Sequence, residues 1–226
     1  MVGEMIELTR LPEDNGGSAN RRKGGMRERL LQLAEEAALE KSFSNISLEE
    51  LAAAAGISKS GFLYHFKSKN DLGLALVKRC TDRQMKMLDD MFIRSDELHD
   101  DPLHNYLIAI KLFSEMIEND PSFNHGFLVN AYTFQDQYHI KGIREIGLGL
   151  LERNRAGILA RLKRIAKQHP LREDMELEAL AEMTLSIVEG GMIISALLND
   201  RMYLPRQLKI YSELIRHAFT PEKAAS

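Results

Sequence analysis

Apolar residues along this chain recur at the three- and four-residue spacing of amphipathic helices. The alternation of apolar and polar residues that marks a half-buried strand is absent. The longest helical stripe comprises Ile143, Ile146, Leu150, Leu151, Asn154, Ile158, Leu162 and Ile165. This pattern predicts an all-α fold.

Proline and aspartate mark two of the helix starts. Asp101-Pro102 and Asp120-Pro121 each combine a capping Asp with a Pro at the first helical position, where its missing N–H costs nothing. We expect two helices between Lys69 and Ser95, the second starting near residue 74 or 81, although no strong breaker marks the join. Further helices are expected over about 103–118, 122–135, 141–167 and 176–198, and after Pro205.

The segment 47–72 carries the sharpest local signals. Ser47 with Glu50 three residues later forms a capping box, and Gly56 stands where a helix would end in a left-handed residue. Ser58 can then cap a second short helix that runs to about Tyr64. Two short helices joined by a tight turn are the layout of a helix-turn-helix, whose second helix enters the DNA major groove.

The distribution of charge agrees with a nucleic-acid reader. The chain has a formal net charge of −3, yet residues 21–79 are net basic and residues 80–226 are net acidic. A basic module on an acidic body is an electrostatic footprint for phosphate. Arg21, Arg22 and Lys23 lie in a Gly-rich polar stretch that we interpret as a disordered arm, and they either reach DNA or form a solvated charge run.

From about Arg27 to Leu76 the chain resembles the DNA-binding domain of the TetR/AcrR family of bacterial transcriptional regulators. The resemblance rests on RERLLQLAEEAALEKSF as a first helix, SLEELAAAAGIS as a second, and SKSGFLYHFKSKNDL as the recognition helix with the start of a fourth. The run AAAAGISKSGFLYHFKSK is its most specific part. Ser42 stands where the family often has Gly, which predicts strain, and Lys67 stands where Pro is common.

Candidate DNA contacts gather on and after the second short helix. Lys59 and Ser60 lie at its start, where Lys can donate to guanine and Ser can serve either strand. The resemblance implies phosphate contacts for Tyr64 and Lys69, and Lys67 adds another cation. Gly61 is unusual in a helix and would let the backbone approach DNA closely. The full set is Lys59, Ser60, Gly61, Tyr64, His65, Lys67 and Lys69. Phe43, Ile46, Phe62 and Phe66 are expected to form the core of this module.

We divide the chain into an arm over 1–24, a three-helix helix-turn-helix domain over 25–72, and a larger helical domain over 73–226. The resemblance implies that the last long helices form a four-helix-bundle homodimer, and small residues on both helices would permit close approach. Ordinary packing within one chain is the alternative. The candidate interface residues are Leu150, Ile158, Leu162, Val188, Gly191 and Ser195.

The stretch from Leu103 to Tyr138 is rich in aromatic residues. The resemblance implies that a small, mostly apolar effector binds in the core of this second domain, in an apolar pocket with few polar groups. Plain helical core is the alternative interpretation of the aromatic residues. The weak candidates for effector contact are Phe113, Met116, Phe127 and Tyr132.

Other chemistries find little support. His99, Asp101 and His104 are explained by capping rather than by a metal, and the single thiol of Cys80 fits inert packing in a reducing cytoplasm. No cofactor is predicted, no catalytic arrangement of side chains can be defended, and no apolar run reaches the length of a membrane span.

The sequence therefore predicts a cytoplasmic, dimeric, ligand-responsive DNA-binding regulator, usually a repressor in this family. Its partners would be a palindromic double-stranded operator, a second copy of itself and an unidentified small effector. The alternatives are a helical protein-interaction module and an all-α enzyme with an unrecognised site.

Overall fold

A computed structural model of the protein describes residues 18–119 and 141–219. Every regular element in those ranges is a helix, which confirms the all-α prediction. The elements are α1 (Ser18–Lys41), the short 3-10 helix η1 (Phe43–Asn45), α2 (Leu48–Ala55), α3 (Lys59–His65), α4 (Lys69–Leu98), α5 (Pro102–Asn119), α7 (Lys141–Ala166), α8 (Leu177–Leu198) and α9 (Tyr203–Phe219). The predicted helix over 122–135 lies outside the described residues.

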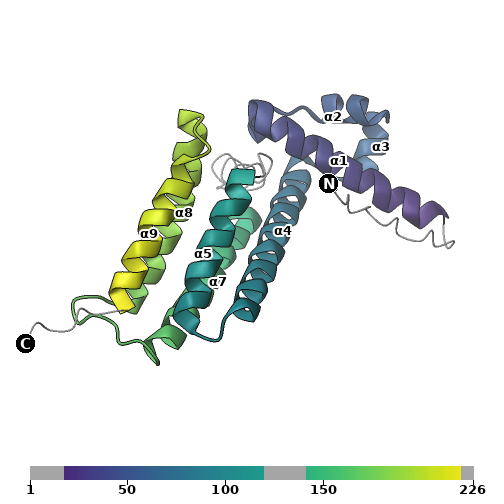
Figure 1. Ribbon diagram of the computed structural model, residues 1–226. Coiled ribbons are helices and arrows are strands. Elements are labelled where there is room, and N and C mark those ends of the chain that lie inside the picture. Colours follow the sequence, from purple (N-terminus) through teal and green to yellow (C-terminus); the bar gives the residue numbers. More distant parts are fainter. Residues whose placement is uncertain (1–17, 120–140, 220–226) are drawn as a thin grey trace, which may run out of the picture.

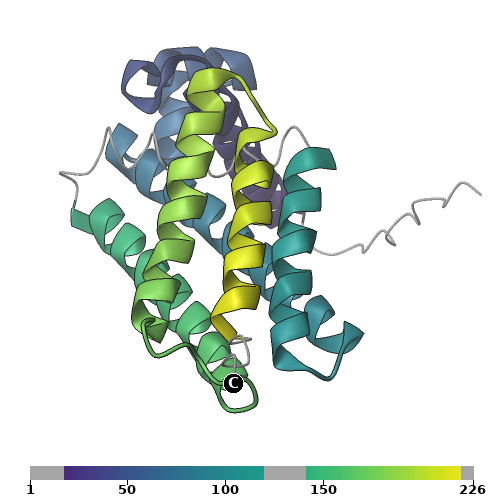
Figure 2. The ribbon, with the colours of Figure 1, turned by 60° about the vertical axis from the view of Figure 1, so that its left-hand side comes forward.

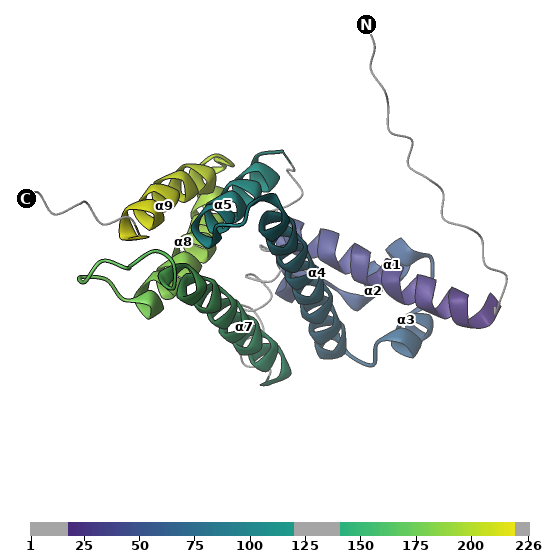
Figure 3. The same ribbon diagram turned by 60° about the horizontal axis from the view of Figure 1, so that its bottom comes forward.

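The helices form a small head and a larger body that share α4. Helices α1, α2 and α3 lie together at one end of the molecule, and α4 runs from them along the body (Figure 1). Helices α5, α8 and α9 lie side by side in the body (Figure 2). The head lies on one side of α4, and α5, α7, α8 and α9 lie on the other (Figure 3). Any movement of α4 relative to the body therefore reorients the head.

The head has its own hydrophobic core. Phe43, Phe62 and Phe66 are completely buried and Ile46 is nearly so, which confirms the four predicted core residues. Leu30 and Leu31 of α1 and Leu72 and Leu76 of α4 complete this core. Because α3 contributes Phe62 and is followed by Phe66, its opposite face is turned to solvent.

The local signals of the helix-turn-helix are confirmed. Ser47 and Glu50 form a complete capping box, in which the Ser47 Oγ accepts from the Glu50 N–H at 3.3 Å. Gly56 ends α2 in the left-handed conformation, with φ 71° and ψ 31°, where a side chain would be strained. The Ser58 Oγ caps α3 by accepting from the Gly61 N–H at 3.1 Å.

Three predicted boundaries were wrong. Helix α4 is one unbroken helix rather than two. Its buried residues continue along the whole helix, with Leu76 packing in the head core and Met91 packing in the body core. Helix α9 begins at Tyr203, so Pro205 lies within its first turn, where a missing N–H is tolerated. Helix α1 begins at Ser18, within the predicted arm, because extending an existing helix needs no new nucleus.

Ser42, between α1 and η1, has φ 64° and ψ 150°. This region of backbone space is populated almost only by glycine, and a residue with a side chain there carries strain of about 1–3 kcal/mol. The strain predicted from the departure at this position is therefore present in the structure.

Ser42→Gly is expected to stabilise the protein. Relief of the strain exceeds the extra backbone entropy that Gly loses on folding, which leaves a net gain of about 1 kcal/mol in the free energy of unfolding. Urea denaturation followed by circular dichroism measures it. Ser44→Gly, two residues away at a negative φ, is the matched control and should lower the same free energy. Equal changes in both variants would show that the Ser42 backbone carries no strain.

Candidate functional site

The exposed face of α3 carries several of the predicted DNA contacts. Lys59, Ser60 and Tyr64 are exposed, and 68% of the Tyr64 surface is accessible. A large aromatic side chain on the solvent face of a short helix contributes nothing to the head core. The face is therefore available to a ligand, with a cation at its start and a phenol one turn later.

Lys59 forms an exposed ion pair with Glu49. Its Nζ lies 2.6 Å from Glu49 Oε1 of α2, and both side chains are about three-fifths exposed. The hydrogen bond from Lys59 is the main reason that the pKa of Glu49 falls to about 2. Exposed ion pairs contribute little to stability, typically about 0–1 kcal/mol. Lys59 can therefore exchange Glu49 for a phosphate or a base edge at small cost.

Gly61 and His65 lie differently from the other candidates. A Cβ at Gly61 would meet Ile57 Cβ at 3.4 Å, an ordinary contact with the turn of the motif. The structure thus gives this glycine a neighbour within the chain. The His65 ring meets Tyr64 edge-on at 5.2 Å, and its Nδ1 is buried without a hydrogen-bond partner among the described residues. Only the rest of the His65 ring is placed to approach DNA.

Lys67 and Lys69 both make contacts within the head. The Lys67 N–H donates to Asp71 Oδ2 at 3.0 Å, a bond that the proline common at this position in the family could not make. The Lys69 Nζ donates to the Ser44 carbonyl oxygen at 2.6 Å and lies 5.6 Å from the centre of the Phe43 ring. Lys69 therefore ties the start of α4 to η1, and any phosphate must share its ammonium group with that contact.

Two arginines of α4 hold α1. Arg83 donates to Glu35, whose side chain is only 11% exposed, and Arg79 Nη2 lies 3.1 Å from Glu28 Oε1. The hydrogen bond that Arg83 donates to Glu35 is the largest cause of the raised pKa of Arg83. Gln84, the next residue of α4, lines a cavity in the body. One helix thus contacts the cavity on one face and the head on another.

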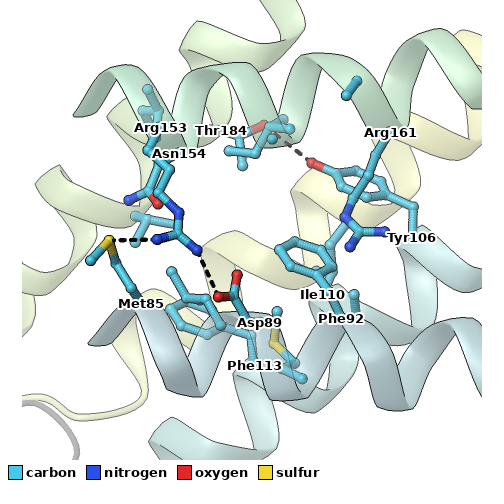
Figure 4. A pocket seen from close by; sticks show the side chains of 18 of the residues that line it. Met85, Asp89, Phe92, Tyr106, Ile110, Phe113, Arg153, Asn154, Arg161 and Thr184 are labelled. Carbon is cyan, nitrogen blue, oxygen red and sulfur yellow. Dashed lines mark hydrogen bonds and ion pairs between the residues drawn. The ribbon is translucent and has the colours of Figure 1, made fainter. Parts of the chain in front are cut away.

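The body encloses a cavity of about 520 Å³ between α4, α5, α7, α8 and α9 (Figure 4). Phe113, one of the four predicted effector contacts, lines it. Met116 is half-buried and does not line the cavity, so that prediction was wrong. Phe127 and Tyr132 lie outside the described residues. The apolar wall includes Met85, Leu88, Phe92, Ile110, Ile158 and Leu185.

Polar groups interrupt this wall more often than the sequence predicted. Arg153 Nη2 lies 2.6 Å from Asp89 Oδ2, and its Nη1 donates to Met85 Sδ at 3.1 Å (Figure 4). Asp96 is shared by two arginines, Arg161 at 3.1 Å and Arg164 at 2.6 Å. Burial alone would raise the pKa of Asp96, but the hydrogen bonds from both arginines outweigh it and lower that pKa.

A buried cluster of hydroxyl groups forms another part of the wall. The Tyr106 hydroxyl lies 3.4 Å from Thr184 Oγ1 and 3.3 Å from the Tyr211 hydroxyl, and Thr184 also contacts Tyr211 directly. Thr184 Oγ1 donates to the Leu180 carbonyl at 2.9 Å. Burial raises the pKa of both tyrosines, so both remain neutral donors. The three residues come from α5, α8 and α9, and sequence spacing gives no signal that they meet.

Glu189 of α8 also lines the cavity. Burial raises the pKa of its carboxyl group. Unlike Asp89 and Asp96, Glu189 has no ion pair or hydrogen bond from its side chain among the described residues. It is therefore the uncompensated acid of the cavity.

The six residues predicted for a subunit interface are turned into the subunit. Leu150, Ile158 and Leu162 are buried, and Ile158 and Val188 line the cavity. Ser195 is buried and its Oγ accepts from the Leu204 N–H at 3.3 Å. Gly191 packs against Leu204 of α9. These residues were wrong as interface contacts, because the stripes chosen from the sequence are the ones that face the body core.

A different face of α7 and α8 is apolar and exposed. We name it the α7–α8 face and define it by Leu148, Leu151, Gly190, Ile193 and Leu197; Leu197 is 79% exposed. By length and composition α8 could cross a membrane, with a mean hydropathy of 1.5 over its most apolar window, of which 28% is buried. A single helix of this kind is weak evidence for a membrane. An apolar face this exposed is typical of a surface covered by a partner.

The side chain of Asp101 caps the start of α5 and also contacts a histidine ring. Asp101 Oδ1 accepts from the His104 N–H at 2.9 Å, and Asp101 Oδ2 lies 2.5 Å from His169 Nε2. Among the described residues no group of three or more His, Cys, Asp or Glu side chains could hold a metal. Cys80 is buried, and burial with the nearby Glu35 charge raises its thiol pKa to about 12.

Comparison with known proteins agrees with the geometry of the head. Residues 30–76 match the family model described as bacterial regulatory proteins, tetR family. The chain is 21% identical over 193 residues to the HTH-type transcriptional repressor AcnR of Corynebacterium diphtheriae, covering 84% of this chain and 91% of that protein. It is 30% identical over 98 residues to the transcriptional regulator AcuR of Cereibacter sphaeroides, covering 43% and 41%.

The fold of the whole chain is also represented among solved structures. A TetR-family transcriptional regulator from Agrobacterium tumefaciens superposes with a TM-score of 0.69 at 18% identity, covering 85% of this chain and 98% of that one. The likeness therefore extends beyond the matched head to the helical body.

Proposed function

We propose that this chain, which belongs to the TetR family of bacterial transcriptional regulators, is a dimeric repressor that releases its operator when a small molecule fills the body cavity. The observation that carries the proposal is the solvent-facing side of α3, with Lys59 and Tyr64 exposed on a head that is continuous, through α4, with the cavity. Proteins of this family are regulators and not enzymes, which removes the enzyme alternative.

Recognition of DNA would begin at α3. In a helix-turn-helix the second helix enters the major groove, so Lys59 and Ser60 reach base edges while Tyr64 contacts the backbone. Lys67 and Lys69 add positive charge at the start of α4, where the helix dipole also favours phosphate. The ion pair of Lys59 with Glu49 keeps the lysine extended along the head until DNA replaces the carboxylate.

Two copies of the head are needed to read a two-fold operator, whose half-sites lie about 34–36 Å apart. The α7–α8 face supports a dimer, because it places several exposed apolar side chains on two long helices that pack together. In a two-fold dimer the same face serves both subunits, and small residues such as Gly190 allow the helices to approach closely. We propose this face in place of the six buried residues.

Control by a ligand would pass along α4. A ligand that fits the cavity better in one position of α4 shifts the population toward that position, and only by its difference in affinity for the two states. Because Arg79 and Arg83 fix α1 to α4, the head follows. The two heads of the dimer then lose the spacing that matches the operator. The protein would act in the cytoplasm, where the bacterial chromosome lies.

DNA binding is tested with fragments selected from genomic DNA by the purified protein. Affinity for a selected fragment should fall steeply with salt, and Lys59→Ala should weaken it by about 1–3 kcal/mol and alter the preference among single-base variants. Lys78→Ala is the matched control, since Lys78 is an exposed lysine of α4 that pairs with Asp82 one turn later and is not among the predicted DNA contacts. A salt-independent affinity would favour the alternative of a protein-interaction module.

A further inference from the structure

The charges that line the cavity are unevenly compensated. Three arginines and three acids face it, but all three arginines are committed to two of the acids: Arg153 to Asp89, and Arg161 with Arg164 to Asp96. Arg161 also stacks over the Phe92 ring at 3.9 Å from its centre, so its charge is further stabilised. No cation of the described chain remains for Glu189.

Glu189 is surrounded by groups that cannot neutralise it. Its neighbours on the cavity face of α8 include Leu185 and Val188, and α7 presents Asn154 and Gly157 to the same cavity. Glu189 is half-buried, so its carboxylate has reduced access to water and no counter-charge among these groups, and this partial burial raises its pKa. An acid without a partner in a largely apolar wall is costly, and a cationic group would remove that cost.

We infer that the effector is a cationic amphiphile, a protonated amine carried on an apolar body, whose ammonium group pairs with Glu189. The apolar body would lie along Leu88, Phe92, Ile110 and Phe113, and the hydroxyl cluster of Tyr106, Thr184 and Tyr211 would receive any polar substituent at its far end. This inference rests on the proposed function, since it names the ligand of the same cavity.

The arrangement also argues against an anionic ligand. A carboxylate or phosphate would have to take an arginine from Asp89 or Asp96 and leave that acid unpaired in the cavity wall, in addition to approaching Glu189. A cation leaves every existing pair intact and supplies the one that is missing. A charge-assisted hydrogen bond in a site shielded from water is about twice as strong as a neutral one.

Three probes with one skeleton separate the classes: 4-phenylbutylamine, 4-phenylbutan-1-ol and 4-phenylbutanoate. Isothermal titration calorimetry of the full-length protein near neutral pH should show the amine binding at least about tenfold tighter than the alcohol, with the acid no tighter than the alcohol. Glu189→Gln should lower affinity for the amine by about tenfold or more and leave affinity for the alcohol nearly unchanged.

Glu182→Gln is the matched control. It makes the same chemical change on the exposed side of α8, where Glu182 pairs with Arg155 at 2.7 Å, and it should leave all three affinities as in the wild type. Glu189→Gln should melt at the same temperature as the wild type or higher, because a neutral amide is easier to bury. A much lower melting temperature would mean that the carboxylate has a structural partner, and would overturn the inference.

The inference is also overturned if the amine does not bind, if the acid binds more tightly than the amine, or if Glu189→Gln leaves the amine affinity unchanged. Titrating the probes into the complex with a selected DNA fragment separates it from the proposed function. Amine binding that depends on Glu189 but leaves DNA affinity unaltered would contradict ligand control and leave the ligand class standing. Release of DNA by the alcohol or the acid, and not by the amine, would contradict the ligand class and leave ligand control of DNA binding standing.

Discussion

Leu197→Glu is expected to convert the protein into monomers and to weaken its binding to a two-fold operator by about a hundredfold or more. Leu197 is the most exposed large apolar side chain of the described residues, at 79%, and it lies one turn after Ile193 on the α7–α8 face. In a two-fold interface the same face serves both subunits, so a single substitution places two altered side chains in the interface. Each copy would bury an unpaired carboxylate, which costs several kcal/mol or prevents association altogether.

Sedimentation velocity over a range of dilutions measures the association, and fluorescence anisotropy with a selected operator fragment measures DNA affinity. Far-UV circular dichroism should remain that of the wild type, because Leu197 makes no buried contact within the subunit. Ile210→Glu on α9 is the matched control, since Ile210 is also exposed, at 65%, but does not belong to the α7–α8 face. A Leu197→Glu protein that remains dimeric while Ile210→Glu dissociates would move the interface to α9.

The head could be predicted from the sequence almost residue by residue, because its signals are local. The capping box at Ser47 and Glu50, the left-handed Gly56 and the cap at Ser58 each depend on neighbours within four residues. The strain at Ser42 was predicted for another reason, since the resemblance places a glycine at that position. Contacts between segments were not: the hydrogen bond from Lys69 to Ser44 joins residues 25 positions apart, and nothing in the spacing of the lysine indicates it.

The interface residues were mistaken because α7 and α8 are apolar on two sides. A periodic stripe reveals that a helix buries a face, but not whether the neighbour is the same chain or another copy. The stripe chosen on α7 ends in Leu162 and Ile165, both completely buried within the subunit. Leu151, a member of the same predicted stripe, remains exposed together with Leu148. Only the positions of α4, α5 and α9 show which side of α7 and α8 faces the subunit core and which side stays exposed.

The cavity was the least predictable part of the structure. Phe113 was predicted and lines the cavity, but Phe92 and Tyr211 were not, and the polar groups come from helices far apart in the sequence. Arg153 and Asp89 are 64 positions apart, and Arg161 and Asp96 are 65. No sequence pattern singled out Glu189 among the glutamates of α8. Glu189 is uncompensated because no arginine of the cavity pairs with it, and the order of residues in the sequence does not indicate that.

Gly190 and Gly191 are adjacent glycines with opposite surroundings, and substituting each with Leu is expected to damage a different property. A Cβ at Gly191 would lie 2.6 Å from Leu204 Cδ1 and 3.3 Å from Leu204 Cβ and Cγ, and Leu204 is completely buried. A Cβ at Gly190 would have nothing within 4 Å. Successive residues of an α-helix point about 100° apart, so Gly191 faces α9 while Gly190 faces outward on the α7–α8 face.

Gly191→Leu should therefore lower the free energy of unfolding by about 3 kcal/mol, at the upper end of overpacking costs, because α8 and α9 must separate to admit the side chain. Gly190→Leu should leave the subunit as stable as the wild type, since Leu favours a helix over Gly by up to about 1 kcal/mol, and should weaken association instead. Urea denaturation and sedimentation at one protein concentration measure both properties, because dimer stability depends on concentration. If Gly191→Leu dissociates the dimer while the subunit keeps its stability, the close approach at Gly191 is between two copies, and α9 does not pack on α8 as described.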